Sequence, residues 1–82
     1  MIESYNFKIT LTDEYYADVI VSNGHNGCLV EYEFDYTVYY FGKTIKFSIM
    51  RRLGYPEKYE ITNKAYYYLG MNWDRYLKQN EK

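Results

Sequence analysis

Apolar and polar residues alternate with a period of two along most of the first 50 positions of the chain. The pattern is longest between Cys28 and Phe41, where apolar side chains occupy the even positions. Successive side chains of a strand point to opposite faces of a sheet, so this period predicts a strand with one apolar face and one polar face. The polar face carries Glu31, Glu33, Asp35 and Thr37.

A second strand follows after Gly42-Lys43, with Ile45, Phe47 and Ile49 on its apolar side. Glycine suits the first position of a two-residue hairpin loop, where the backbone needs a positive φ. We therefore expect a hairpin whose loop is Gly42-Lys43. This register pairs Phe41 with Thr44, Tyr40 with Ile45, Tyr39 with Lys46, Val38 with Phe47, Tyr36 with Ile49 and Glu33 with Arg52.

Two earlier segments, residues 5–11 and 15–21, alternate in the same way and are predicted to be strands. A short polar turn, residues 12–14, joins them. Residues 22–27, SNGHNG, are rich in residues that tolerate turns and are predicted to be a loop. Because short links join strands that are neighbours in the sheet, we expect a four-stranded antiparallel meander in order 1-2-3-4.

The period changes in the last third of the chain, after Leu53–Glu57. Pro56 can open a short helical turn over residues 57–61, because proline loses nothing at the first helical position. From Thr62, the expected N-cap, the spacing is helical. Gly70 interrupts the pattern; we expect one helix over residues 63–79, the alternative being a helix that ends at Gly70 and restarts at Asn72. The expected buried stripe is Ala65, Tyr66, Leu69, Trp73, Tyr76 and Leu77.

These elements predict a single α+β domain, residues 1–82, in which the C-terminal helix packs on one face of the sheet. The helix is expected to cover the even-numbered side chains of the third strand, with Trp73, Leu69 and Leu77 closing the core. The opposite face of the sheet stays uncovered. Residues expected on that open face include Tyr16, Ile20, Leu29, Tyr39 and Met50.

Composition adds two facts to this picture. The chain has 13 tyrosines in 82 residues, and its formal net charge is −1. An AT-rich coding sequence raises Tyr, Asn, Lys and Ile together, whereas tyrosine is also enriched where proteins bind one another; both explanations stay open. The charge is uneven: residues 1–42 have seven acidic residues and one lysine, and residues 43–64 have six basic residues and two acidic ones. Such asymmetry indicates distinct acidic and basic surfaces.

The sequence gives no support to an enzyme, a cofactor or a metal site. Its one cysteine and one histidine, Cys28 and His25, lie close in sequence, but the expected inward direction of Cys28 favours a small buried residue over a nucleophile. A structural zinc site needs four such ligands. With no signal peptide, no membrane-length apolar run and no cysteine pair, we expect a cytoplasmic protein without a membrane partner, in the host cytoplasm if phage-encoded.

The carboxylates of the third strand are the most unusual feature of the predicted open face. If Val21 pairs with Cys28, Asp18 lies opposite Glu31 and extends the cluster. One interpretation is a solvated face, balanced in part by Lys8 beside Asp18 and Arg52 beside Glu33. The side-chain spacing of about 6.8 Å along a strand is too wide for a shared cation and too sparse for complete DNA mimicry. The other interpretation is an acidic surface that docks a basic protein patch.

Our leading hypothesis is a non-enzymatic protein-binding module that docks a basic, nucleic-acid-handling partner through this face. Small, tyrosine-rich, acidic-faced chains are of the kind that phages and mobile elements use as inhibitors, for example anti-CRISPR or host-takeover proteins; this is an analogy of size and composition. A homodimer through the same face is compatible with it. The expected partner-binding residues are Tyr16, Asp18, Glu31, Glu33, Asp35 and Tyr39.

The second hypothesis is direct binding of RNA or single-stranded DNA by the basic segment 43–64. Cations for phosphates and aromatic rings for bases are what single-stranded nucleic acid binding uses. No named nucleic-acid motif is present, and these residues can instead rim the helix and balance the acidic strands. The residues of this alternative site are Arg51, Arg52, Tyr55, Lys58 and Tyr59.

Overall fold

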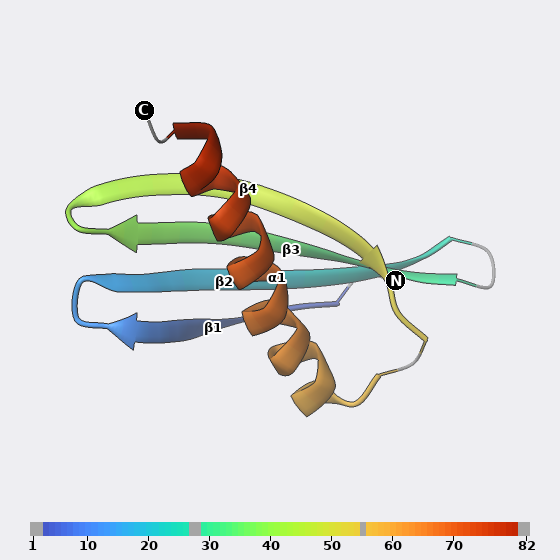
Figure 1. The fold of residues 1–82 in the computed structure, drawn as a ribbon. Coiled ribbons are helices and arrows are strands. Elements are labelled where there is room, and N and C mark those ends of the chain that lie inside the picture. Colours follow the sequence, from blue (N-terminus) through green and yellow to red (C-terminus); the bar gives the residue numbers. More distant parts are fainter. Residues whose placement is uncertain (1–2, 27–28, 55, 81–82) are drawn as a thin grey trace.

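The computed structural model describes residues 3–26, 29–54 and 56–80 of the chain. These residues form a four-stranded antiparallel sheet in order β1-β2-β3-β4, followed by one helix (Figure 1). The predicted α+β meander with a C-terminal helix is confirmed. The elements are β1 (Glu3–Thr12), β2 (Tyr15–Asn26), β3 (Leu29–Tyr40), β4 (Lys43–Arg52) and α1 (Lys58–Asn80).

The helix lies across one face of the sheet (Figure 1), and the side chains of the core lie between the two layers. The even-numbered side chains of β3 are on this covered face, as predicted, and Phe34, Tyr36 and Val38 are almost inaccessible to solvent. No helix in the described part of the chain has the length and apolar character of a membrane span. The buried core consists of Ile9, Ala17, Val19, Val21, Val30, Tyr32, Phe34, Tyr36, Val38, Ile49, Ile61, Ala65, Tyr68, Leu69 and Trp73.

Helix α1 begins at Lys58, five residues before the predicted start at residue 63, for which Thr62 was the expected N-cap. The backbone carbonyl of Glu57 accepts from the N–H groups of Glu60 and Ile61, and the Glu60 carboxylate accepts from the Glu57 N–H. The contact from the Glu60 carboxylate is the N3-to-N-cap half of a capping box, and the Glu57 carbonyl accepts the first bonds of the helix, so Glu57 takes the N-cap position. The Thr62 hydroxyl instead donates to the Lys58 carbonyl within the first turn. The predicted N-cap is therefore wrong, and the turn expected over residues 57–61 is the first turn of the same helix.

The helix runs through Gly70 without a break, so the alternative with two helices is wrong. Its buried stripe differs from the predicted one at one position: Tyr66 is 45% exposed and Tyr68 is buried. The reason is the helical phase set by Ala65, because residues three and four positions on share its face while the next residue lies about 100° away. The side chains of Tyr76 and Leu77 lie outside the described part of the structure.

The hairpin between β3 and β4 turns one residue earlier than the sequence predicted. Tyr40 pairs with Lys43, and the loop is Phe41-Gly42, with φ angles of 48° and 82°. Positive φ at both loop residues is the type I′ geometry, whose twist matches that of the flanking strands. The predicted Gly42-Lys43 loop and its pairs are wrong by two residues. The observed pairs include Tyr39–Thr44, Val38–Ile45, Thr37–Lys46, Tyr36–Phe47, Phe34–Ile49, Glu33–Met50 and Glu31–Arg52.

The β2–β3 hairpin is also longer than predicted. Strand β2 continues to Asn26, which pairs with Leu29, so most of the expected loop 22–27 is strand. Turn-tolerant residues still carry backbone donors and acceptors, and pairing with β3 satisfies them. Val21 lies opposite Phe34, not Cys28, and Cys28 itself lies outside the described residues. The register differs from the predicted one by an even number of residues, so each side chain keeps its face.

A hydrogen bond from Tyr36 ties the sheet to the helix. Its hydroxyl donates to the backbone carbonyl of Ala65 over 2.7 Å, in a buried position. The Tyr36 ring stacks on Phe47 of the neighbouring strand, with ring centroids 4.9 Å apart. The side chain therefore fixes where α1 sits on the sheet, because a buried hydroxyl needs its acceptor at hydrogen-bond distance.

We predict opposite effects for alanine at two glycines. Gly42→Ala places a side chain at a φ of 82° and should destabilise the fold by about 1–2 kcal/mol. Gly70→Ala should stabilise it by about 0.5–1 kcal/mol, because a Cβ there meets no atom within 4 Å and alanine favours the helix. Urea unfolding monitored by circular dichroism measures both. A Gly42→Ala variant that is not destabilised would contradict the turn geometry, and a destabilised Gly70→Ala variant would contradict the expectation for the helix.

We predict that Tyr36→Phe lowers the free energy of unfolding by about 1 kcal/mol, the net value of one buried hydrogen bond. The ring and its packing stay, so only the bond to Ala65 is lost. Tyr39→Phe, on the other face of the same strand, is the matched control and should change stability by less than about 0.5 kcal/mol. Equal effects of the two substitutions would show that the Tyr36 hydroxyl contributes nothing specific.

Candidate binding face

The sheet face opposite α1 is the candidate site, and we refer to it as the open face. The observed registers align its side chains in rows that run across the strands. Each row contains one residue from each of the four strands. The four complete rows are Thr10–Tyr16–Tyr39–Thr44, Lys8–Asp18–Thr37–Lys46, Asn6–Ile20–Asp35–Ser48 and Ser4–Ser22–Glu33–Met50.

An aromatic pair occupies the end of the open face nearest the β1–β2 and β3–β4 turns. Tyr16 and Tyr39 lie directly opposite each other, and their rings stack with centroids 4.9 Å apart and planes 23° apart. The ammonium of Lys8 lies 5.2 Å from the centre of the Tyr16 ring. Both tyrosines were predicted as partner-binding residues, and the fold brings them together.

The four predicted carboxylates also share the open face, but not in the predicted arrangement. Asp18 lies opposite Thr37, so the expected Asp18–Glu31 pair is wrong. Glu31 lies opposite Gly24, Glu33 opposite Ser22 and Asp35 opposite Ile20. No two of these carboxylates face each other directly, which avoids the destabilising contact of like charges across strands. They form a staggered group on the two inner strands.

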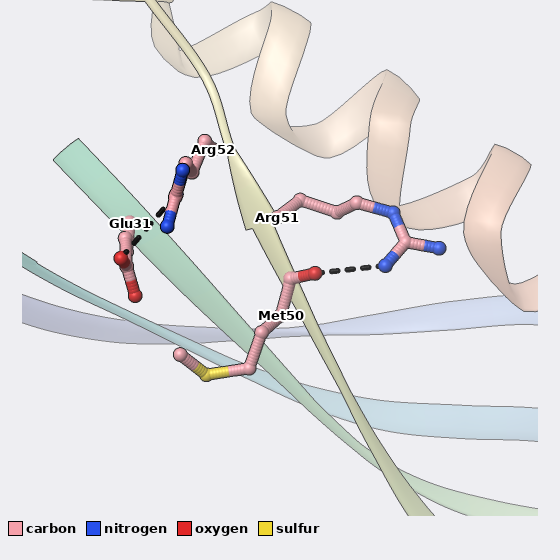
Figure 2. A network of polar contacts seen from close by, with 4 residues as sticks. All are labelled: Glu31, Met50, Arg51 and Arg52. Carbon is pink, nitrogen blue, oxygen red and sulfur yellow. Dashed lines mark hydrogen bonds and ion pairs between the residues drawn. The ribbon is translucent and has the colours of Figure 1, made fainter. Parts of the chain in front are cut away.

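Two of the carboxylates have partners. Arg52 lies opposite Glu31, with its Nε 3.4 Å from a carboxylate oxygen (Figure 2), and Ser48 donates a hydrogen bond to Asp35. The expected Arg52–Glu33 pair is wrong, because Glu33 lies opposite Met50. Lys8 lies opposite Asp18, as predicted. Within residues 3–26, 29–54 and 56–80, however, neither Asp18 nor Glu33 forms an ion pair.

Charge is therefore sorted by strand on the open face. The carboxylates are on β2 and β3, in the middle of the sheet, and the cations Lys8, Lys46 and Arg52 are on the outer strands β1 and β4. Two large apolar side chains accompany them: Ile20 is 47% exposed and Met50 is 53% exposed. The face thus has an acidic middle, an aromatic end and two exposed apolar side chains.

The two arginines of the alternative nucleic-acid site do not share one face of the sheet. Arg51 and Arg52 project to opposite sides of β4 (Figure 2). Arg51 lies over the ring of Tyr68 in the helix, 5.0 Å from its centre, and donates to the Met50 carbonyl. The Lys58 ammonium lies 5.1 Å from the centre of the Tyr5 ring. Tyr59 is exposed on α1, and Tyr55 lies outside the described residues.

Shifted pKa values occur among the tyrosines on the covered side of the sheet. Burial, with smaller contributions from Tyr40 and Asp74, raises the pKa of Tyr15 to about 12. Burial also raises the pKa of Tyr36 and, to a lesser degree, that of Tyr5. These shifts follow from packing under the helix and mark no reactive group. No cluster of three metal-ligating side chains is present in the described part of the chain.

One exposed aromatic residue beside the aromatic end differs from its predicted position. Phe41 was expected in the third strand but sits in the turn, 59% exposed. Glycine at the second position of a two-residue loop, as in Asn-Gly turns, was the signal that could have placed it. The alternation pattern could not have placed it. A loop at 41–42 and a loop at 42–43 give registers that differ by two residues, so every side chain keeps the same face in both.

We predict that the fold loses stability as the pH rises above about 10. An unfolded tyrosine has a pKa near 10, and the buried tyrosines keep their protons to higher pH, so alkaline conditions favour the unfolded chain. The contribution is complete below pH 10 and is lost as the pH rises towards the folded-state pKa. Melting temperatures from pH 8 to pH 11 measure the loss, which should be smaller in Tyr36→Phe and in Tyr15→Phe. If melting temperature fell with pH as steeply in both variants as in the unaltered protein, the buried tyrosines would not be the cause of the loss.

The chain was compared with protein families, curated proteins and solved structures. No protein-family model matches the chain, and neither a curated protein nor a solved structure matches it significantly.

Proposed function

We propose that the protein is a non-enzymatic binding module whose open face docks a basic surface of a partner that handles nucleic acid. The observation that carries the proposal is the position of the carboxylates on the two inner strands of the uncovered face. The fold does not require them there, because the core lies entirely on the other side of the sheet. Neutral polar residues would solvate the face equally well.

Electrostatics favours a cationic partner. Same-face neighbours on a strand lie about 6.8 Å apart, so Glu31, Glu33 and Asp35 repel one another along β3. Arg52 offsets this repulsion at one end only. A basic surface laid over β2 and β3 would remove it along the whole strand and would also be steered towards the face before contact.

The dimensions of the face suit a protein partner. Ten residues per strand at about 3.3 Å and four strands about 4.8 Å apart give an area of roughly 600 Å². A standard protein interface takes about 800 Å² from each partner, so the face and its rim approach that size. Tyr16 and Tyr39 supply the large, half-buried aromatic side chains that dominate binding energy in such interfaces.

A second copy of the chain fits this face less well than a basic partner. In a two-fold dimer the same patch meets itself, so the acidic middle of one sheet would lie on the acidic middle of the other. The nucleic-acid hypothesis draws less support from the structure, since Arg51 packs on the helix side and Arg52 pairs with Glu31. Both remain outcomes that the experiment below can detect.

We predict that Asp18→Asn/Glu33→Gln weakens partner capture by about tenfold or more, equivalent to about 1.4 kcal/mol. The matched control is Glu57→Gln/Asp74→Asn, which changes net charge equally on the helix side. The measurement is affinity purification from nuclease-treated extract of the native host, followed by titration of the recovered partner at increasing salt.

Equal capture by both variants would refute docking through the open face. Binding of RNA or single-stranded DNA at low salt that is lost in Arg52→Ala would support the alternative. Sedimentation of the purified chain as a dimer that the Asp18/Glu33 variant strengthens would support self-association.

A further inference from the structure

A small hollow lies between the two hairpin turns at the aromatic end of the open face, with a volume of about 360 Å³. The two turns lie at the same end of the sheet (Figure 1), and a hydrogen bond from the Phe41 N–H to the Glu14 carbonyl, 2.8 Å long, links them. The β1–β2 turn is further braced by the Thr12 hydroxyl, which accepts from the Glu14 N–H. The hollow is lined by Asp13, Glu14, Tyr16, Tyr39, Phe41, Gly42, Lys43 and Thr44.

Phe41 is the unusual residue of this lining. Its φ of 48° is in the left-handed region, which bulky side chains rarely adopt and which Asn, Asp or Gly fill at little cost in this turn type. Its ring contacts Tyr40 edge-on but stays largely exposed, so burial does not compensate the strain. A strained, exposed aromatic residue is better explained by a ligand than by the fold.

The rings of the hollow favour a positive charge. The faces of aromatic rings attract cations. The Lys8 ammonium, which is not part of the lining, lies 5.2 Å from the centre of the Tyr16 ring and already occupies it, so Tyr39 and Phe41 are the rings left for a further cation. Tyr16 stacks on Tyr39, which brings a second aromatic side chain to the same lining. Phe41 adds a third.

The charged residues of the hollow favour a cation with directional hydrogen bonds. Asp13 and Glu14 contribute two carboxylates against the single ammonium of Lys43, which leaves a net negative lining. A guanidinium is planar, stacks on aromatic faces and offers paired N–H donors to a carboxylate, whereas an ammonium is a compact and strongly hydrated charge. Flat rings next to carboxylates therefore match arginine better than lysine.

We propose that this hollow binds an arginine side chain of the docked partner. The inference rests on the proposed function. The arginine would be the anchor residue of the partner's basic surface, and the rest of that surface would cover the acidic middle of the open face. A phosphate would meet two carboxylates, and an apolar side chain would desolvate them without replacing their hydrogen bonds.

The test uses the whole chain and short blocked peptides, so it does not require the partner. The isotope-labelled protein is titrated with acetyl-Gly-Arg-Gly-amide and followed by NMR. The same titration is repeated with citrulline, which keeps the shape and removes the charge, with lysine and with trimethyl-lysine. We expect the arginine peptide to shift the amides of residues 13–16 and 39–44 and to bind more tightly than all three others.

Phe41→Asn separates binding from folding. Asparagine tolerates the positive φ, so the turn and the melting temperature should be retained, while loss of the ring should weaken the arginine peptide roughly twofold to fivefold. Asp13→Asn should weaken it as well. Met50→Ala, at the other end of the open face, is the control and should leave the affinity unchanged.

Equal binding of citrulline or lysine, or an affinity unaffected by Phe41→Asn, would overturn the arginine assignment. So would amide shifts confined to residues around Glu31 and Glu33. Failure here is distinguishable from failure of the proposed function: a partner still captured through Asp18 and Glu33 would show that the face docks without this anchor. Binding of the arginine peptide without any partner capture would show that the hollow binds arginine although the proposed docking through the open face is wrong.

Discussion

One-sided coverage of the sheet is the constraint on which the rest of the molecule depends. The helix in the described part of the chain can bury only one face of four strands, where the apolar core holds it and the Tyr36 hydroxyl adds a hydrogen bond to the Ala65 carbonyl. Because every strand then needs an apolar side and a solvated side, the period-two pattern becomes the dominant feature of the first 50 residues. Under the same constraint, the side chains of the open face need only be compatible with water, because none of them has to fill the core.

The charged side chains of the open face are therefore not explained by the needs of the core. Acids in the middle and cations at the edges make a field that is negative over β2 and β3 and partly balanced outside them. The exposed pair between Glu31 and Arg52 adds little stability by itself, since surface ion pairs contribute about 0–1 kcal/mol. Its structural effect is to occupy Arg52, and among the described residues Glu33 and Asp18 form no ion pair.

The turn before β4 and the helix start after it differ in local conformation: the first is strained and the second is regularly capped. At the helix start, Glu57 and Glu60 satisfy each other's backbone groups as a helix terminus requires, and no ligand is implied. At the Phe41-Gly42 turn the second residue follows the rule for positive φ and the first breaks it. Consistent local chemistry elsewhere in the chain makes this exception meaningful, because departures from local rules concentrate at functional positions.

The sequence by itself determined which side chains share a face. Alternation assigns Glu33 and Tyr39 to one side and Phe34 and Tyr36 to the other, and a register error of two or six residues preserves that assignment because both numbers are even. It also determined the strand order, the helix and the open face. Which residues meet across strands was decided only by the tertiary structure, since the position of a two-residue turn depends on backbone twist. The β2–β3 register separated Asp18 from Glu31, and the position of the β3–β4 turn joined Arg52 to Glu31 and placed Phe41 in the turn.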